Sequence, residues 1–486
     1  MIRSVEESNY KVTFAALVIG GGAFALLQSM VLPVLPTIER NFHTSQNNVT
    51  WVLTAYLLSA AVFTPILGRI GDMVGKQRIL VATLSVLAVG SLLACLAHSI
   101  GILIVARAIQ GVGGGVLPLS FGIIRDECPK ERVASNVGFI AAVTAIAFGL
   151  GIVLAGPIVE HLGFHWLFWV PLIIVVIAVA MAQFFVPESP IRTPGGVSWL
   201  AAVLLSVWLV ALLVAVSEAP TWGWVSTKTL AVVGLAVVAA GAWVMVELRA
   251  RTPLIDMKMM RAPAVWINNL VTFLFGAGMY AALAFLPEFL QTPKSSGYGF
   301  GASITQSGLF LVPMTVTTFL GGLFMGRIAA GVGAKVGVFV GALAGCGSYL
   351  MLAFAHHHSW EIYVASTLLG VGLGLGFSAM STLIVQAVPA SQTGVASGMN
   401  ANIRTIGGAI GASIMASIVT ANLLGSGFPA DSGYTHGFAF LAAVMVVAGA
   451  AALLIPKSGI AAVPPHDAHL DHAELAIVAG GTITDA

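Results

Sequence analysis

Charged residues are scarce in this chain: they make up 8% of its 486 positions, whereas hydrophobic residues make up 58%. A soluble domain carries about 25% charged residues, so a soluble globular protein is excluded. The mean hydropathy of +0.98 indicates an integral membrane protein instead. Cysteine is also rare, and the three scattered residues Cys95, Cys128 and Cys346 do not predict a disulfide framework. The sequence lacks a phosphate-binding loop ending in Gly-Lys-Ser/Thr, which excludes ATP hydrolysis as the energy source.

Long apolar runs, by contrast, recur along the whole chain. A helix needs about 20 predominantly apolar residues to cross a bilayer. Runs of this length are found at residues 12–36, 49–67, 78–97, 102–124, 134–157, 165–186, 198–217, 228–247, 264–290, 303–325, 335–355, 360–386, 393–421 and 436–455. The sequence therefore predicts an all-α integral membrane protein with fourteen transmembrane helices.

Basic residues are distributed unequally between the predicted loops. If the N-terminus is cytoplasmic, 16 Lys and Arg residues fall on the inner side and three, Arg40, Lys228 and Lys294, on the outer side. Short cytoplasmic loops of membrane proteins carry such an excess. The first helix follows a mixed-charge segment and lacks a cleavage site, so we expect it to be retained. We predict a multi-pass protein of the plasma membrane with both termini in the cytoplasm.

A short repeat divides the helices into two sets. Gly68-Arg-Ile follows the second predicted helix, and Gly326-Arg-Ile follows the tenth, 258 residues later. Glycine-rich stretches also recur at the fourth helix of each set. Parallel repeats of this kind place a substrate site between the two halves, near the middle of the bilayer. We predict an N-terminal six-helix bundle, two inserted helices with linkers, a C-terminal six-helix bundle and a flexible cytoplasmic tail, at residues 1–190, 191–262, 263–456 and 457–486.

Two motifs indicate a family. Gly68-x-x-x-Asp72-x-x-Gly75-Lys76-x-Arg78 resembles the loop signature of the major facilitator superfamily, and Arg107-x-x-Gln110-Gly111-x-Gly113 resembles its helix-4 signature. Fourteen helices with an inserted pair resemble the drug:proton antiporter branch. The resemblance implies a major-facilitator fold and alternating access. It also implies export driven by the proton gradient, with no cofactor.

The loop signature is expected to act as a conformational latch. In the family, its acid lies against the inner end of the helix predicted here at residues 393–421. A carboxylate near a helix N-terminus is stabilised by about 0.3–1 kcal/mol. Loss of this contact would favour opening toward the inner side. The resemblance assigns the latch to Gly68, Asp72, Gly75, Lys76 and Arg78.

Arg107 lies inside an apolar run, where a charged side chain costs roughly 2.5–3.5 kcal/mol. The resemblance implies that it takes part in proton coupling. Small residues let membrane helices approach closely. We therefore expect helix packing at Gly111, Gly113, Gly114, Gly115, Gly151, Gly156 and Pro157. The Gly156-Pro157 pair lies later in its helix than in typical antiporters of the family.

The proton carrier is not where the family has it. Related antiporters carry an aspartate in the first helix, whereas this stretch offers only Gln28. Glu288 is the main acid inside a predicted helix, and intramembrane acids are functional by default. It is the candidate carrier, although it can also be an interface residue. Arg404, in the thirteenth helix, is expected to face the central cavity together with Arg107.

The central cavity is expected to be neutral to positive, because few acids are buried. This favours neutral or weakly anionic apolar compounds over cationic drugs. Side chains predicted to line it are Gln28, Trp51, Tyr56, Gln110, Phe148, Phe275, Tyr280 and Asn402.

We therefore expect a monomeric exporter of small hydrophobic compounds, embedded in the bilayer and exchanging substrate for protons. No enzymatic activity, metal site or nucleic-acid partner is expected, and the histidines at 356–358 and in the tail are attributed to polar segments. Two alternatives stay open: a substrate-specific importer or symporter on the same fold, and a lipid-handling or regulatory membrane protein without coupled transport.

Overall fold

Fourteen helical segments of the computed structural model are long and apolar enough to cross a membrane. The structure describes residues 2–44, 46–189, 198–250, 253–389, 392–421, 424 and 428–456. The count agrees with the fourteen predicted helices, and the ends differ by a few residues. The tail predicted at 457–486 lies outside the described residues, as does the predicted boundary near residue 190.

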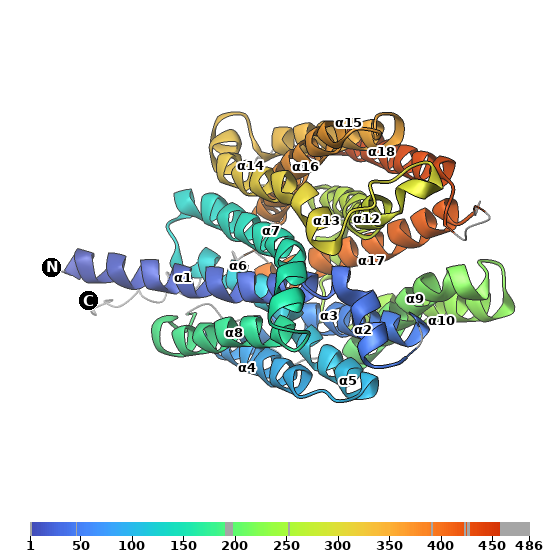
Figure 1. Cartoon of the computed structure of the whole chain (residues 1–486). Coiled ribbons are helices and arrows are strands. Elements are labelled where there is room, and N and C mark those ends of the chain that lie inside the picture. The colour runs from blue at the N-terminus through green and yellow to red at the C-terminus, as the bar shows by residue number, and fades with distance from the viewer. Residues whose placement is uncertain are drawn as a thin grey trace, which may run out of the picture.

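The N-terminal bundle forms the lower part of Figure 1, coloured blue to blue-green. Its apolar faces meet in one continuous core. The bundle consists of six spanning segments: α1 (Ile2–Ser29), α3 (Gln46–Val74), α4 (Lys76–Cys95), α5 with α6 (Ile100–Gly111 and Val116–Glu127), α7 (Lys130–His161) and α8 (Trp166–Phe185).

The C-terminal bundle forms the upper part of Figure 1, coloured yellow to red, and has its own core. It repeats the six spanning segments: α12 (Pro263–Gln291), α13 with α14 (Ile304–Phe310 and Val312–Gly331), α15 (Ala334–Phe354), α16 (Ser359–Ala387), α17 (Thr393–Val419) and α18 (Asp431–Leu453). The bundles meet along α3 and α17 on one side and along α7, α14 and α16 on the other.

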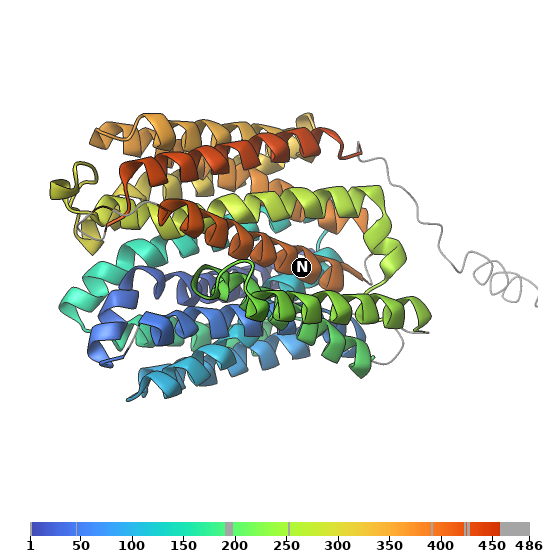
Figure 2. The same ribbon diagram turned by 90° about the vertical axis from the view of Figure 1, so that its right-hand side faces the viewer.

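The two inserted helices, α9 (Trp199–Trp222) and α10 (Thr227–Arg249), form a hairpin at the α3–α17 seam. Figure 2 turns this edge to the viewer and shows the hairpin in green beside α17. The Ser413 hydroxyl on α17 donates to the Val216 carbonyl at 2.8 Å, and the Trp224 ring N–H donates to the Ser417 hydroxyl at 2.8 Å. α10 has few buried residues, so its outer face is available to lipid.

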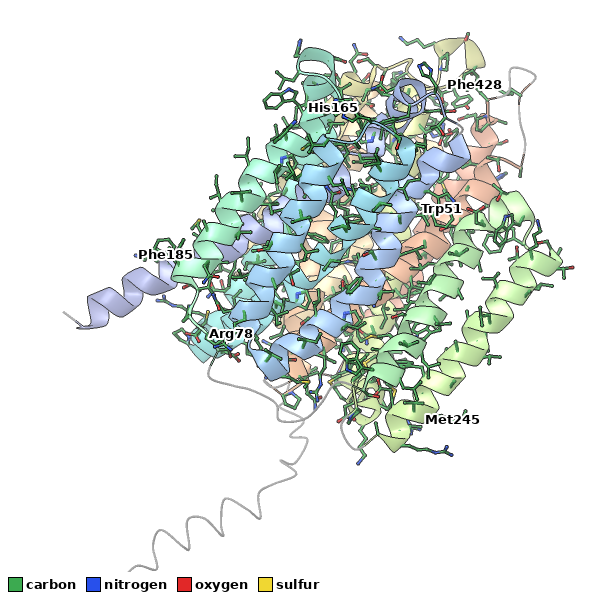
Figure 3. All side chains as sticks on the ribbon, turned by 90° about the horizontal axis from the view of Figure 1, so that it is seen from below. Trp51, Arg78, His165, Phe185, Met245 and Phe428 are labelled. Atoms are coloured by element: carbon green, nitrogen blue, oxygen red, sulfur yellow. The ribbon has the colours of Figure 1, made fainter. Side chains whose placement is uncertain are left out.

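The two ends of the molecule separate the loops as the topology requires. Figure 3 shows Arg78 and Met245 at one end and His165 and Phe428 at the other. We call the first the inner end, because Arg78, which lies there, belongs to a loop that the sequence predicts to be cytoplasmic. A short helix, α11 (Met257–Arg261), precedes α12 at this end.

Three predicted helices are interrupted. The first ends at Ser29 and continues through η1 (Leu32–Val34) into α2 (Leu35–Asn41), with proline in the first turn of η1. The fourth contains a 3₁₀ segment, η2 (Val112–Gly115), because its glycines adopt a tighter turn between α5 and α6. The tenth is divided at Leu311, and α14 begins at Val312 with Pro313 in its first turn.

Glycines set the contact between α12 and α17 in the C-terminal bundle. A Cβ atom added at Gly407 would overlap the carbonyl of Phe273, and one added at Gly276 would overlap the carbonyl of Arg404. The two backbones therefore touch directly, as they do where small residues line membrane-helix interfaces. No larger residue fits at these positions without a shift of one helix.

We expect Gly407→Ala to destabilise the protein by about 1–3 kcal/mol, because overpacking of a close interface forces the backbones apart. The midpoint of thermal unfolding of the purified protein should fall accordingly. Gly234→Ala is the matched control, since a Cβ there meets no atom within 4 Å. Equal midpoints for both variants would contradict the proposed close contact.

Candidate functional site

A cavity of about 100 Å³ lies between the two bundles. Helices α1, α6 and α7 of one bundle and α12, α14, α16 and α17 of the other form its wall. Most of the wall is apolar, and hydroxyl and amide groups are interspersed. Among the described residues that line it, Arg404 is the only charged one. The aromatic and polar members used below are Phe148, Phe377, Gln28, Tyr280, Ser397 and Asn400.

Four residues predicted for transport lie on this wall: Gln28, Phe148, Tyr280 and Arg404. The Gln28 amide donates a hydrogen bond to the Tyr280 hydroxyl at 3.1 Å, which joins α1 to α12 across the cavity. The Arg404 guanidinium lies 5.2 Å from the centre of the Phe377 ring. The cavity thus has a polar side contributed by both bundles.

Three other predicted cavity residues belong to the N-terminal bundle and do not line the cavity. Tyr56 is fully buried and stacks on Phe24, with ring centroids 5.9 Å apart. Gln110 is also buried and donates to the Ser91 hydroxyl at 3.1 Å. Trp51 is half-buried toward the end that carries Phe428, as Figure 3 shows. All three therefore face neighbouring helices or the outer end.

Two further predicted cavity residues, Phe275 and Asn402, lie at interfaces between helices. Phe275 is 1% exposed and packs on Phe377, with ring centroids 6.2 Å apart. Asn402 donates its amide to the Ala61 carbonyl at 2.5 Å, which joins α17 to α3. Both side chains point away from the cavity because they lie on other faces of α12 and α17.

Arg107 is completely buried, which excludes a side chain that reaches toward solvent from a helix end. Its Nε donates to the Val52 carbonyl at 3.2 Å, and Nη1 donates to the Leu27 carbonyl at 3.1 Å and to Gln110 Oε1 at 2.8 Å. The guanidinium also lies 4.2 Å from the centre of the Tyr56 ring. The expectation that Arg107 faces the cavity with Arg404 is wrong, because these contacts hold it between α1, α3 and α5.

The glycines after Arg107 let the α5–α6 segment approach α3. A Cβ at Gly111 would lie 2.5 Å from the Tyr56 carbonyl oxygen. Cβ atoms at Gly114 and Gly115 would meet α3 in the same way, while Gly113 faces α4 and α1. Close approach by the backbone is what brings the Arg107 side chain within reach of carbonyls on α1 and α3.

At the inner end, Asp72 on α3 lies against the first turn of α17. A Cβ at Gly394 would lie 3.0 Å from an oxygen of this carboxylate, and a Cβ at Gly68 would lie 2.6 Å from the Gly394 carbonyl oxygen. A negative charge at a helix N-terminus is stabilised by the unpaired N–H groups and the helix dipole. The contact joins the two bundles where the resemblance places the latch.

The other latch residues hold the inner loop of the N-terminal bundle. Lys76 Nζ lies 3.4 Å from Asp72 and 2.6 Å from Asp126, and all three side chains are buried. Gly75 adopts a φ of 134°, a conformation that a residue with a side chain rarely adopts. Arg78, by contrast, is mostly exposed and pairs with Glu188 at 3.4 Å, within its own bundle.

Arg125 completes the inner contact, and it is one of the 16 basic residues that the sequence places on the inner side. Its Nη1 donates to the Val385 carbonyl at 2.5 Å and to the Thr393 hydroxyl at 2.8 Å. It therefore joins α6 to the end of α16 and the start of α17. Its position near the end of an apolar run gave no signal that separates this role from anchoring at the membrane surface.

The bundles also meet at the outer end. The Thr305 hydroxyl on α13 donates to Glu160 on α7 at 3.0 Å, and the backbone of Thr305 lies against Gly156. Gly151 packs within the N-terminal bundle, against Ser29 and Met30. Pro157 lies inside α7, which continues to His161. Contacts between the halves are thus present on both sides of the cavity.

Glu288 lies near the outer end of α12, outside the cavity. Glu288 as a whole is exposed, and its carboxylate accepts a hydrogen bond from the Tyr434 hydroxyl at 3.3 Å. Both residues belong to the C-terminal bundle. A proton on Glu288 would therefore influence the cavity through α12 and α18, without direct contact with a substrate.

Comparison with protein families identifies this architecture. Residues 17–411 match the family described as Major Facilitator Superfamily, and residues 269–479 match it a second time. The chain belongs to the major facilitator superfamily. The second match begins within α12, the first helix of the C-terminal bundle, in agreement with the internal repeat. Proteins of this superfamily are transporters, so this one is a membrane transporter and not an enzyme.

Several relatives of this major facilitator protein are named for drug or antibiotic export. The multidrug transporter MdtP of Bacillus subtilis is 25% identical over 425 residues, covering 87% of this chain and 77% of that protein. The multidrug resistance protein Stp of Mycobacterium tuberculosis is 29% identical over 409 residues, covering 83% and 75%. The tetracenomycin C resistance and export protein of Streptomyces glaucescens is 26% identical over 423 residues, covering 86% and 77%.

Two further similarities broaden the comparison. The uridine/deoxyuridine transporter of Lactococcus lactis is 27% identical over 461 residues, covering 91% of this chain and 94% of that protein. The crystal structure of the human organic anion transporter MFSD10 aligns with a TM-score of 0.67 at 16% identity, covering 91% and 99% of the two chains. At this identity the structural similarity supports the fold alone.

Proposed function

We propose that this transporter exports small hydrophobic compounds from the cytoplasm in exchange for protons. The observation that carries the proposal is the mainly apolar cavity between the two bundles, with contacts between the halves on both of its sides. Such a site can be opened to one side at a time when the bundles rock. The names of three relatives, which are multidrug or antibiotic exporters, support the direction and the substrate class.

We further propose that the protein lies in the plasma membrane with both termini in the cytoplasm and works as a monomer without a cofactor. The basic residues of the sequence support this orientation, because 16 of them fall in predicted loops on the same side of the membrane as the N-terminus. Described residues of both bundles of one chain line the cavity, which supports a monomer.

Efflux of a panel of dyes and antibiotics from cells with and without the protein tests the proposal. Cells that contain the protein should accumulate less of at least one apolar compound, and a protonophore should abolish the difference. The nucleoside transporter among the relatives supports importer function as the second candidate. Uptake of radiolabelled uridine in the same cells tests it, and uptake without efflux of any compound would favour the importer.

Proton coupling needs a carrier, and no carboxylate lines the cavity among the described residues. Glu288 remains the proposed carrier, since it lies inside a spanning helix. Glu288→Gln mimics the protonated carboxyl permanently. The variant should still bind neutral substrate but equilibrate it passively. Substrate-induced proton release from proteoliposomes, recorded with a pH-sensitive dye, should fall at least about tenfold, because the glutamine side chain cannot release a proton. A tenfold change corresponds to about 1.4 kcal/mol.

The matched control is Glu218→Gln on the inserted hairpin. Its carboxylate also accepts a hydrogen bond from a hydroxyl, that of Thr221 at 3.1 Å, near the outer end of a helix. This control should release protons like the wild type. Wild-type release by Glu288→Gln would show that Glu288 is an interface residue and that coupling uses another group or another ion.

A further inference from the structure

Arg404 is a cation without a protein partner inside the transport cavity. It lies in α17, and its side chain forms part of the cavity wall. Within the described part of the chain, its guanidinium has no hydrogen bond and no ion pair, and its recorded contact is the face of the Phe377 ring at 5.2 Å. A guanidinium offers five N–H donors, so a ligand with acceptor atoms has all of them available.

The other intramembrane arginine shows what a structural arginine looks like in this protein. Arg107 donates to two backbone carbonyls and one amide oxygen and is completely buried. Those acceptors belong to the protein, and Nη2, which has no acceptor among the described residues, is buried away from the cavity. Arg404 differs in both respects, because it is only partly buried, lines the cavity and makes no hydrogen bond to a described residue. The difference leaves Arg404 as the intramembrane arginine within reach of a ligand in the cavity.

Tyr280 and Gln28 contribute further polar groups to the cavity wall. The Tyr280 ring packs over Gly408, one turn of α17 beyond Arg404. The Tyr280 oxygen accepts a hydrogen bond from Gln28, and its own O–H has no acceptor among the described residues, so it can donate to a ligand. No described carboxylate lines the cavity to neutralise the positive charge. The rest of the wall, which includes Phe148 and Met279, suits an apolar body.

We propose that the cavity recognises amphiphilic organic anions, with Arg404 binding the acidic group. The substrate would be an apolar, ring-containing compound with a single carboxylate, sulfonate or ionised phenol. The acidic group would accept hydrogen bonds from Arg404 and Tyr280, and the apolar part would lie against Phe148 and Phe377. This inference rests on the proposed export function and adds the charge class of the substrate.

Equilibrium binding to the purified full-length protein in phosphatidylcholine nanodiscs tests the charge class. Three fluorescent probes share one ring system: dansylglycine is an anion, dansylamide is neutral and dansylcadaverine is a cation. The wild type should bind dansylglycine at least about tenfold more tightly than dansylamide, as expected for one charge-assisted hydrogen-bonded contact, and should bind dansylcadaverine least. Nanodiscs without protein correct for partition into lipid.

Variants of Arg404 assign the preference to this residue. In Arg404→Gln the ratio of the dansylglycine and dansylamide affinities should fall to about 1, and Arg404→Lys should keep part of it, because the charge remains but the planar fork is lost. Arg327→Gln is the matched control. Arg327 is exposed and lies outside the cavity, and its guanidinium also lies over a phenylalanine ring, 5.8 Å from the centre of Phe324. Its replacement should leave the ratio of the two affinities unchanged.

Two results would overturn the inference: equal affinity of the wild type for anion and neutral probe, or an unchanged ratio in Arg404→Gln. Dansylamide binding by Arg404→Gln shows that the variant is folded. Adding phosphatidylglycerol to the nanodiscs distinguishes a lipid headgroup from a small organic acid, since a lipid ligand would displace dansylglycine. If the wild type shows the anion preference but no efflux from cells, the export proposal fails while the anion site stands.

Discussion

Replacing Arg107 by alanine is expected to lower the initial rate of substrate efflux at least about tenfold. The substitution removes the donor that joins the Leu27 carbonyl on α1 and the Val52 carbonyl on α3 to α5. It also leaves the buried Gln110 Oε1 without its donor. An unpartnered buried acceptor costs about 1–3 kcal/mol, which corresponds to roughly a tenfold change or more. The amount of protein in the membrane should stay similar, because alanine lowers the cost of insertion.

Arg107→Lys should restore little of the efflux, since a single ammonium group cannot reproduce bonds from both Nε and Nη1. Arg327→Ala, which removes an exposed arginine from α14, serves as the control and should transport like the wild type. Efflux rates are normalised to the protein quantified in membranes. Full activity of Arg107→Ala would mean that the contacts between α1, α3 and α5 are dispensable for transport.

Asp72→Asn is expected to shift the protein toward states open to the inner side. The substitution keeps the shape of the side chain but removes the negative charge at the first turn of α17 and the ion pair with Lys76. The charge at a helix N-terminus contributes about 0.3–1 kcal/mol, which corresponds to a change of about two- to fivefold in the ratio of the two states.

Cysteine labelling measures this shift in a variant that lacks the native residues Cys95, Cys128 and Cys346. Ser397 lines the cavity and lies only four residues into α17, at its inner end, so Ser397→Cys reports on inner access. In inside-out vesicles, a membrane-impermeant maleimide should react with it about two- to fivefold faster when Asp72→Asn is present. A cysteine at Thr305, near the outer contact, should react more slowly from the outside.

The control for the latch is Asp256→Asn. Asp256 also lies at a helix N-terminus at the inner end, where it accepts bonds from the backbone N–H groups of Lys258 and Met259. Within the described residues its hydrogen bonds go only to its own short helix, so labelling should not change. Equal labelling of the Asp72 and Asp256 variants would mean that the loop only anchors the topology.

The fold could be predicted because each spanning segment is encoded locally by about twenty apolar residues and because basic residues mark every second loop. The interruption after Ser29 was not predicted. Hydropathy does not register it, since the segment beyond the break is as apolar as the helix before it. The break depends on backbone geometry near Pro33, which a count of apolar residues does not measure.

The cavity could be predicted only in part, because nearly every face of these helices is apolar. Tyr280 and Phe275 are five residues apart, so they point about 140° apart on α12. One lines the cavity and the other packs on Phe377. Likewise Arg404 lines the cavity, whereas Asn402 points to α3. Composition identifies such residues as candidates, but only the rotation of each helix within the bundle separates them.

The inserted hairpin touches both bundles but is tied to one. The hydrogen bonds that join it to a bundle in the described residues run to Ser413 and Ser417 on α17, whereas it meets α3 by packing and by the attraction between Glu247 and Arg69. In the proposed rocking motion, the side bonded to α17 would move with that helix, and the contacts on the other side would slide along α3. The hairpin would thus move together with the C-terminal bundle, and the N-terminal bundle would move against it. The seam between α3 and α17 would then stay covered by protein as long as α9 keeps contact with both helices.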